Sequence, residues 1–254
     1  MTILLVRHAE SAANFDGKIY DTTADHMIHL TEKGQQQATE LGHFLKDWYA
    51  NNPPQKDVRA WCSPYKRTML TLAGLKQTMD NWPWNKNKSG LDVQYDDRLR
   101  ERAWGLYSHY HYEQGTLLQK ENEFLHSHIN RIRNTEMGRY FVRPLGGESM
   151  ADVALRLHSF FHDLYFDMNN GNRDHMIVMH GMAILAFVYA FAKIHPFFFD
   201  EEPIMGNTGV RLLDINPATG LYADYGIIYD PEANIYLLNK PEQPVFRDMS
   251  RIIG

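Results

Sequence analysis

Short apolar segments alternate with amphipathic helical patterns along this chain, and this alternation restricts the possible folds more than any other feature. Residues 3–6 and 175–179 are dominated by apolar side chains, the pattern of strands buried on both faces of a sheet. Residues 58–62 are predicted as a further strand, and residues 210–215 as the start of a hairpin. The sequence therefore predicts an α/β fold with a mainly parallel sheet and an antiparallel edge near the C-terminus.

Helices are predicted between these strands from capping residues and from the spacing of apolar positions. Thr31 is placed to cap a helix whose apolar residues recur every three or four positions. Ser63, which precedes a proline, is predicted as the N-cap of a second helix. Ser149 begins a third helix, because Asp152 stands where it completes a capping box. Residues 182–193 form an apolar stretch of helical length.

One stretch is too long for a connection in a minimal α/β unit. Residues 102–145 lie between strand-like and helical segments and hold many Tyr, His, Arg and Glu side chains. Connections of this length are usually functional or contain structure of their own. No repeat or low-complexity linker divides the chain, so we predict one domain over residues 1–254. Residues 102–145 are then a partly helical insertion over one face of the sheet.

Composition excludes several classes of protein. The formal net charge of -5 argues against nonspecific binding of nucleic acid, which requires a basic face. The single cysteine, Cys62, cannot form an internal disulfide and fits a reducing compartment. The most apolar segment, residues 183–192, is about half as long as the ~20 residues of a membrane span. We therefore expect a cytoplasmic protein with neither a nucleic-acid nor a membrane partner.

Basic and imidazole side chains follow the predicted strands at the point where each strand ends. Arg7 and His8 come directly after the first strand, and His180 and Gly181 directly after a later one. Ligands of open parallel sheets bind outside the carboxyl ends of the strands, so both histidines are expected to face one crevice. Arg67, near the start of a predicted helix, points back toward the same edge. Each residue alone is more typical of a structural role, but together they predict a phosphate pocket.

Several motifs in this chain resemble those of the histidine phosphatase superfamily, whose members include the cofactor-dependent phosphoglycerate mutases. The first matching motif is residues 5–14, and the resemblance as a whole covers roughly residues 3–215. Two positions depart from the family pattern: Ala9 stands where glycine is most common, and Met179 where serine is common. The further matching segments, in the family's order, are residues 30–38, 63–68, 98–105, 146–156 and 179–181.

The resemblance implies a three-layer α/β/α fold of the phosphoglycerate mutase type, with an inserted lid, and a reaction through phosphohistidine. His8 would be the nucleophile, since a neutral imidazole needs no separate base near pH 7. Arg7, Arg67 and His180 would hold the phosphoryl oxygens and offset the negative charge that develops on them.

The resemblance also implies a proton donor and further phosphate ligands. Glu101 would protonate the departing alkoxide and then take a proton from the attacking water. It must therefore start protonated, which requires a raised pKa. Without the family pattern, Glu101 would be taken for a surface carboxylate. Asn14 and Gly181 match positions that bind the phosphoryl group in the family.

Two pairs of histidines have a spacing that can suggest metal ligands. His109 and His111 form one pair, and His126 and His128 the other. Alternate residues share a face only on a strand, and no cluster of Cys or Asp completes either site. We therefore expect neither a metal nor another cofactor, and a solvated or lid-lining role for these histidines.

Arginines are concentrated in the insertion, and their role stays open. Arg131, Arg133, Arg139 and Arg143 lie within a short stretch. They form either a solvated face or a basic rim above the phosphate pocket that meets the distal part of the substrate.

A phosphatase is the favoured function. The segment after Glu101 differs from the well-known mutase sequence and is similar to broad phosphatases with a Tyr- and Arg-rich stretch before residues 146–149. The alternatives are mutase-type transfer and an inactive binding module, but the presence of His8, Arg67 and His180 beside Glu101 favours an enzyme. The substrate, a phosphorylated small molecule or a phosphoprotein, and the oligomeric state are left open by the sequence.

Overall fold

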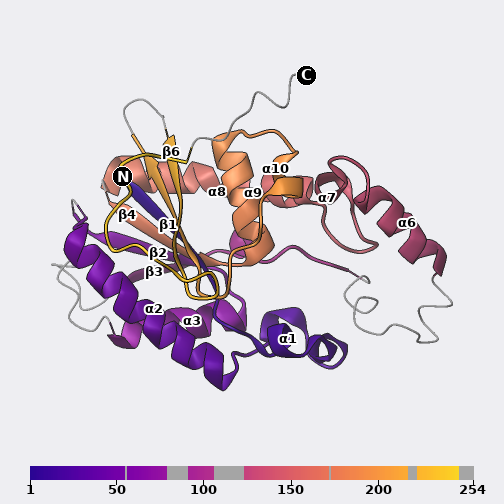
Figure 1. The fold of residues 1–254 in the computed structure, drawn as a ribbon, viewed down its shortest axis with the longest axis horizontal. Helices are drawn as coiled ribbons and strands as arrows, with labels where there is room; N and C mark the ends of the chain where they lie inside the picture. Colours follow the sequence, from indigo (N-terminus) through magenta and orange to yellow (C-terminus); the bar gives the residue numbers. More distant parts are fainter. Residues whose placement is uncertain (55, 79–90, 106–122, 172, 217–221, 246–254) are drawn as a thin grey trace.

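A seven-stranded sheet forms the centre of the protein within the part of the chain that the structure describes (Figure 1). The structure is a computed structural model, and it describes all residues except 55, 79–90, 106–122, 172, 217–221 and 246–254. The strand order is β3-β2-β4-β1-β5-β6-β7. The bounds are β1 Thr2–Arg7, β2 Val58–Cys62, β3 Asp92–Tyr95, β4 Asp174–Met179, β5 Val210–Ile215, β6 Tyr222–Asp230 and β7 Ile235–Tyr236.

The direction of the strands agrees with the prediction. β1 is parallel to β4, and β2 is parallel to both β3 and β4. β5, β6 and β7 pair antiparallel with their neighbours, so the C-terminal edge is antiparallel. Arg7 of β1 lies opposite Met179 of β4, and Cys62 of β2 lies opposite Val178. The carboxyl ends of these three strands therefore lie side by side at one edge of the sheet.

Alternating side chains of β1 belong to two separate hydrophobic cores. Leu4 and Val6 pack in the core beneath α2 (Glu32–Asn51) and α3 (Lys66–Thr78). Ile3 and Leu5 pack in the core beneath α8 (Met150–Gly171) and α9 (Gly181–Ala192), on the other face of the sheet. This two-sided burial produces the three-layer α/β/α fold (Figure 1).

Two of the three predicted caps are confirmed. The Thr31 hydroxyl accepts the backbone N–H of Gly34 at 2.9 Å, and Ser149 and Asp152 exchange the hydrogen bonds of a capping box. Ser63 is not an N-cap, because α3 begins only at Lys66. Its N–H instead continues the β2–β4 pairing by donating to the Val178 carbonyl at 3.0 Å.

The insertion is partly helical in its described part. It contains α6 (Glu123–Arg133) and α7 (Gly138–Phe141), which extend outward beside α9 and α10 (Phe198–Glu201) in Figure 1. The Tyr140 ring of α7 stacks on Phe199 of α10. This aromatic contact attaches the described part of the insertion to the helical layer.

Short helices occupy the region between β1 and α2. They bring residues 12–27 close to the strand ends that carry the candidate site. The short helices are α1 Ala12–Phe15, η1 Gly17–Asp21 and η2 Asp25–Met27, and a further one, η3 Asp97–Leu99, follows β3.

None of the described helices combines the length and the apolar character that crossing a membrane requires.

Candidate active site

The two strand-end histidines meet as predicted. His8 continues the β1–β4 pairing by donating its N–H to the Met179 carbonyl at 3.0 Å. The rings of His8 and His180 pack edge to face with their centroids 5.2 Å apart. Both residues are almost completely buried. The imidazole rings of His8 and His180 therefore lie next to each other at the carboxyl ends of β1 and β4.

The hydrogen bonding of His8 leaves one ring nitrogen available. Nδ1 lies 2.7 Å from the Ala9 carbonyl oxygen, and a carbonyl can only accept, so the contact assigns the proton to Nδ1. Nε2 then carries the lone pair. Burial lowers the pKa of His8 well below its ordinary value, and the charges of Arg67 and Arg7 lower it further. His8 is therefore neutral near pH 7, the state in which imidazole is a nucleophile.

Arg7 is held by the loop before β5. Its backbone N–H donates to Gly209 at 2.9 Å, and its guanidinium donates to the Met205 carbonyl at 2.5 Å. A Cβ on Gly181 would lie 3.4 Å from the Arg7 Nε and 2.6 Å from a methyl group of Ile204. Gly181 thus leaves room for the Ile204 side chain at the start of α9, and the Arg7 guanidinium lies in contact distance beside it.

Arg67 lies in the first turn of α3 and is nearly buried, with 3% exposure. Its Nη1 donates to the backbone carbonyl of Asp25 at 2.7 Å and to the Asp25 carboxylate at 2.8 Å. The guanidinium also lies over the Tyr65 ring, 4.9 Å from its centroid. Asp25 belongs to η2, which sequence patterns did not reveal, and it orients the Arg67 cation.

Glu101 lies against the first turn of α9. Its Oε1 accepts from the backbone N–H groups of Arg102 at 2.8 Å and Ala183 at 3.1 Å, and Oε2 lies 3.4 Å from the Met182 nitrogen. Burial raises the pKa of this carboxyl, although the Arg102 N–H and the charge of Arg67 act in the opposite direction. The raised pKa favours the protonated acid that a proton donor needs.

Asn14 has its amide orientation set by three donors. Its Oδ1 accepts from the N–H of Ser11 at 3.0 Å, the Ser11 hydroxyl at 2.9 Å and the Asn207 amide at 3.3 Å. The amide N–H₂ therefore points away from these groups. Asn207 was not identified from the sequence, and it also donates to the His8 carbonyl at 3.1 Å.

Two buried nitrogens of this site lack a hydrogen-bond partner among the residues that the structure describes. They are Nε of Arg7 and Nδ1 of His180. The other ring nitrogen of His180, Nε2, lies 2.9 Å from the hydroxyl of Ser63. Burial and the charge of Arg67 hold the pKa of His180 well below its ordinary value. A buried polar atom without a partner costs free energy, and a bound anion would offset that cost at the guanidinium.

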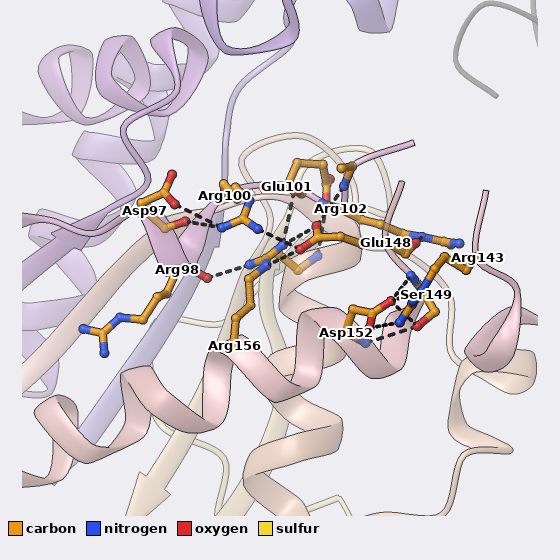
Figure 2. Close-up of polar contacts among 12 residues, drawn as sticks. Asp97, Arg98, Arg100, Glu101, Arg102, Arg143, Glu148, Ser149, Asp152 and Arg156 are labelled. Atoms are coloured by element: carbon orange, nitrogen blue, oxygen red, sulfur yellow. Dashed lines mark hydrogen bonds and ion pairs between the residues drawn. The ribbon is translucent and has the colours of Figure 1, made fainter. Parts of the chain in front are cut away.

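A charged network supports the segment that carries Glu101 (Figure 2). The Glu148 carboxylate accepts from Arg156 at 3.0 Å and from Arg100 at 2.9 Å. Its second oxygen accepts the backbone N–H of Ala103 at 2.9 Å. Arg156 also donates to the Glu101 carbonyl at 3.2 Å. The resemblance to the family included this region without assigning it a role, and the contacts show that it holds residues 100–103 in place.

The described residues contain no group of three or more His, Cys, Asp or Glu side chains arranged to hold a metal ion. His109 and His111 lie outside the described residues, as do the side chains of His126 and His128. The expectation that the protein uses no metal therefore stays a prediction.

Known proteins resemble this chain over most of its length. The sequence profile of the histidine phosphatase superfamily (branch 1) matches residues 3–226. A phosphoglycerate mutase-like protein of Arabidopsis thaliana is 30% identical over 89% of this chain and 67% of its own length. A broad-range acid phosphatase of Saccharomyces cerevisiae is 22% identical over 87% of each chain.

Solved structures support the same relationship at the level of the fold. The structure of a mycobacterial glucosyl-3-phosphoglycerate phosphatase superimposes with a TM-score of 0.63 and 21% identity, over 89% of this chain and 97% of that chain. The profile match extends over both strand-end histidines and over the segment around Glu101. The chain therefore belongs to the histidine phosphatase superfamily, branch 1.

Proposed function

We propose that this protein is a phosphatase that hydrolyses a phosphate monoester through a phosphohistidine on His8. The groups that surround His8 are the main support for this proposal. A neutral imidazole lies beside buried guanidinium and imidazole nitrogens, two of which have no partner among the described residues. A phosphoryl group bound there would supply oxygen acceptors to the Arg7 guanidinium and to His180.

In the first step, Nε2 of His8 attacks phosphorus while the bond from phosphorus to the ester oxygen breaks. Glu101 donates its proton to the departing oxygen, so the product leaves as an alcohol and Glu101 becomes a carboxylate. The Nδ1 proton on His8, held by the Ala9 carbonyl, keeps the attacking nitrogen unprotonated. No separate base is needed to activate this nucleophile.

The positive groups stabilise the charge on the transferring phosphoryl oxygens. Arg7 and Arg67 are held in fixed positions by Met205 and Asp25, so little reorganisation is needed during the reaction. The Asn14 amide, oriented by its acceptor contacts, offers an N–H donor to the same group. Such preorganised donors act most strongly where charge develops in the transition state.

In the second step, a water molecule attacks the phosphorus of phosphohistidine. Glu101 takes the proton of the water, the bond from phosphorus to Nε2 of His8 breaks, and inorganic phosphate leaves. His8 returns to its neutral form and Glu101 to its acid form. The same carboxyl therefore serves as acid and then as base, as a raised pKa allows.

Phosphoglycerate mutase-type transfer is a second candidate, because the relatives include proteins named as mutase-like. A mutase returns the phosphoryl group to the substrate, and a phosphatase gives it to water. Incubation with 3-phosphoglycerate, with and without the bisphosphate, separates the two through the product formed. Release of inorganic phosphate supports the phosphatase, and formation of 2-phosphoglycerate supports the mutase.

The nucleophile is tested by rapid quenching during turnover of an aryl phosphate. The wild-type protein should yield a phosphoenzyme that is acid-labile and alkali-stable, and His8→Ala should yield none. His162→Ala is a matched control, since that side chain is 86% exposed on α8. Turnover retained by His8→Ala would remove the nucleophile assignment.

A further inference from the structure

A cavity of about 130 Å³ lies between the insertion and α9. Three arginines contribute to its lining: Arg102 after η3, Arg133 at the end of α6 and Arg139 in α7. The sequence left the insertion arginines undecided between a solvated face and a basic rim. Arg133 and Arg139 line this cavity, whereas Arg143 forms an ion pair with Asp152.

The cavity shares residues with the wall of the candidate active site. Met182 lines it, and the backbone nitrogen of Met182 lies 3.4 Å from Oε2 of Glu101. Arg102 lines it too, and its N–H donates to Glu101 at 2.8 Å. Ile204, a third lining residue, lies against Gly181. The cavity therefore adjoins the backbone segments that hold Glu101, although Glu101 itself is not among the lining residues. An organic group attached to an ester oxygen at Glu101 would have to extend past Met182 to enter this cavity.

The charged side chains that line the cavity are arginines. Arg102 is 2% exposed, and its guanidinium donates to the backbone carbonyls of Glu148 at 2.7 Å and Val142 at 2.8 Å. Burial lowers the pKa of Arg102 to about 10; the charges of Arg133 and Arg139 also lower it, whereas the carboxylates of Glu101 and Glu148 raise it. Arg102 is still protonated at pH 7. No carboxylate is among the described lining residues, so an anion would be attracted there.

The rest of the lining is apolar except for the indole N–H of Trp104. Ile129, Val142, Pro144, Met182 and Ile204 offer no polar side-chain group to a hydroxyl-rich ligand. An apolar cavity of about 150 Å³ holds one benzene ring, and the 130 Å³ here is close to that size, which limits the occupant to about one ring or a short branched chain. A polyhydroxylated sugar would leave several hydroxyls without partners, which is costly in an apolar site.

We infer that this cavity binds the leaving group of the substrate and selects a compact apolar group that carries a second negative charge, such as a carboxylate. The inference rests on the proposed phosphatase function. Glu101 marks the junction between the two parts of the site: the phosphoryl group lies on the His8 side, and the apolar anionic group lies on the Arg139 side.

Two aryl phosphates of nearly equal size test the inference. 4-Carboxyphenyl phosphate carries the second charge, and 4-carbamoylphenyl phosphate replaces it with a neutral amide. The wild-type protein should show a KM roughly tenfold lower for the carboxylate, the usual worth of a hydrogen bond to a charged group. Arg139→Ala and Arg133→Ala should each remove most of this difference and leave kcat unchanged, because contacts equal in ground and transition states alter KM.

Two further variants separate recognition from folding. Arg131→Ala is the charge-matched control, since Arg131 lies on α6 but not among the lining residues, and it should keep the preference for the carboxylate. Arg133→Glu should weaken the preference for 4-carboxyphenyl phosphate over 4-(aminomethyl)phenyl phosphate more than Arg133→Ala does, because it adds a negative charge beside the two remaining arginines. A damaged fold would instead raise KM for both esters together.

The outcomes distinguish this inference from the proposed function. Hydrolysis of both aryl phosphates with equal KM in the wild-type protein overturns the inference and leaves the phosphatase intact. An equal effect of Arg131→Ala and Arg133→Ala overturns it too, because the charge would then act at a distance. Failure to hydrolyse any aryl phosphate, with no phosphoenzyme on His8, overturns the proposed function itself.

Discussion

The side-chain amide of Asn207 donates to Oδ1 of Asn14 at 3.3 Å, and the same nitrogen donates to the backbone carbonyl of His8 at 3.1 Å. One buried residue on the loop before β5 therefore connects the backbone of His8 to the side-chain amide of Asn14. The adjacent Thr208 adopts a left-handed backbone with φ of 61° and donates its N–H to the same carbonyl of His8. This loop completes the pocket from the antiparallel edge of the sheet.

Asn207→Asp should impair the enzyme more than Asn207→Ala. Alanine removes the donor, whereas aspartate places a carboxylate oxygen against the Oδ1 of Asn14 and the His8 carbonyl. We expect kcat/KM to fall roughly tenfold for alanine, the scale of one or two lost hydrogen bonds, and further for aspartate. Steady-state kinetics with an aryl phosphate measure both.

The control for this pair is Asn170→Ala, an exposed asparagine whose amide donates to the helix backbone at the Phe166 carbonyl. It should leave kcat/KM unchanged. Equal losses for aspartate and alanine at position 207, with unchanged unfolding midpoints, would mean that the orientation of Asn14 does not matter.

Glu101→Gln should slow the hydrolysis of alkyl phosphates by roughly 10²–10⁴, the usual worth of a positioned proton transfer. The loss should be smaller with an aryl phosphate, whose oxygen leaves as a stable anion. Burial raises the pKa of Glu101, so wild-type turnover of alkyl esters should fall as pH rises above that raised value. Glutamine cannot ionise, so this falling limb should be absent from the pH profile of the variant.

If Glu101→Gln slowed the hydrolysis of alkyl and aryl phosphates by the same factor, Glu101 would be assigned to binding or to structure. The wild-type protein and Glu101→Gln should be compared on both esters at each pH, because only the difference between the profiles reports this carboxyl.

The buried His175 should make the fold sensitive to acid. Trp61 donates its indole N–H to Nδ1 of His175 at 3.0 Å, and burial lowers the pKa of His175 from 6.5 to about 3. Below pH 6.5 the unfolded chain takes up a proton that the folded chain does not. The free energy of unfolding should therefore fall with decreasing pH between those two values, by about 1.4 kcal/mol per pH unit for this one proton.

His175→Gln should reduce that slope by about one proton, because the glutamine oxygen can accept the Trp61 hydrogen bond without titrating. Urea unfolding at pH 7, 6 and 5, followed by tryptophan fluorescence, measures the slope. His162→Ala serves as the comparison, since it alters an exposed histidine. Identical slopes in the wild-type protein and His175→Gln would contradict the prediction.

Turnover should not depend on a divalent metal ion, since Arg7 and Arg67 supply the positive charge that a metal would otherwise provide and His180 adds a neutral N–H donor. Dialysis against a chelator, followed by an assay with and without added Mg²⁺, Mn²⁺ or Zn²⁺, tests this. Activity lost on dialysis and restored by one of these ions would overturn the prediction.

The strands and the convergence of the catalytic candidates could be predicted because their signals are local. The apolar runs at residues 3–6, 58–62 and 175–179 lie within β1, β2 and β4. A side chain that directly follows a parallel strand must lie at the carboxyl edge of the sheet, which brings His8 and His180 together. Backbone geometry alone imposes this result.

Partners distant in sequence were not predictable in the same way. The residue pairs Ser63–His180, Asp25–Arg67 and Asn207–Asn14 are brought together by the fold, and no periodicity relates their positions. Ser63 has the local pattern of a helix cap, yet the strand continues through its backbone and its hydroxyl contacts His180. A tertiary contact here outweighs a local preference for capping.

The insertion shows the same division between local pattern and tertiary contact. Its many arginines are evident in the sequence, but their separation into cavity-lining Arg133 and Arg139 and ion-paired Arg143 depends on where α6 and α7 lie. The packing of Tyr140 on Phe199 determines that placement. The local sequence therefore determines which residues follow the strands. The packing of distant segments decides which charged side chains face a cavity, because the neighbours of a side chain are brought together only when the layers of the fold assemble.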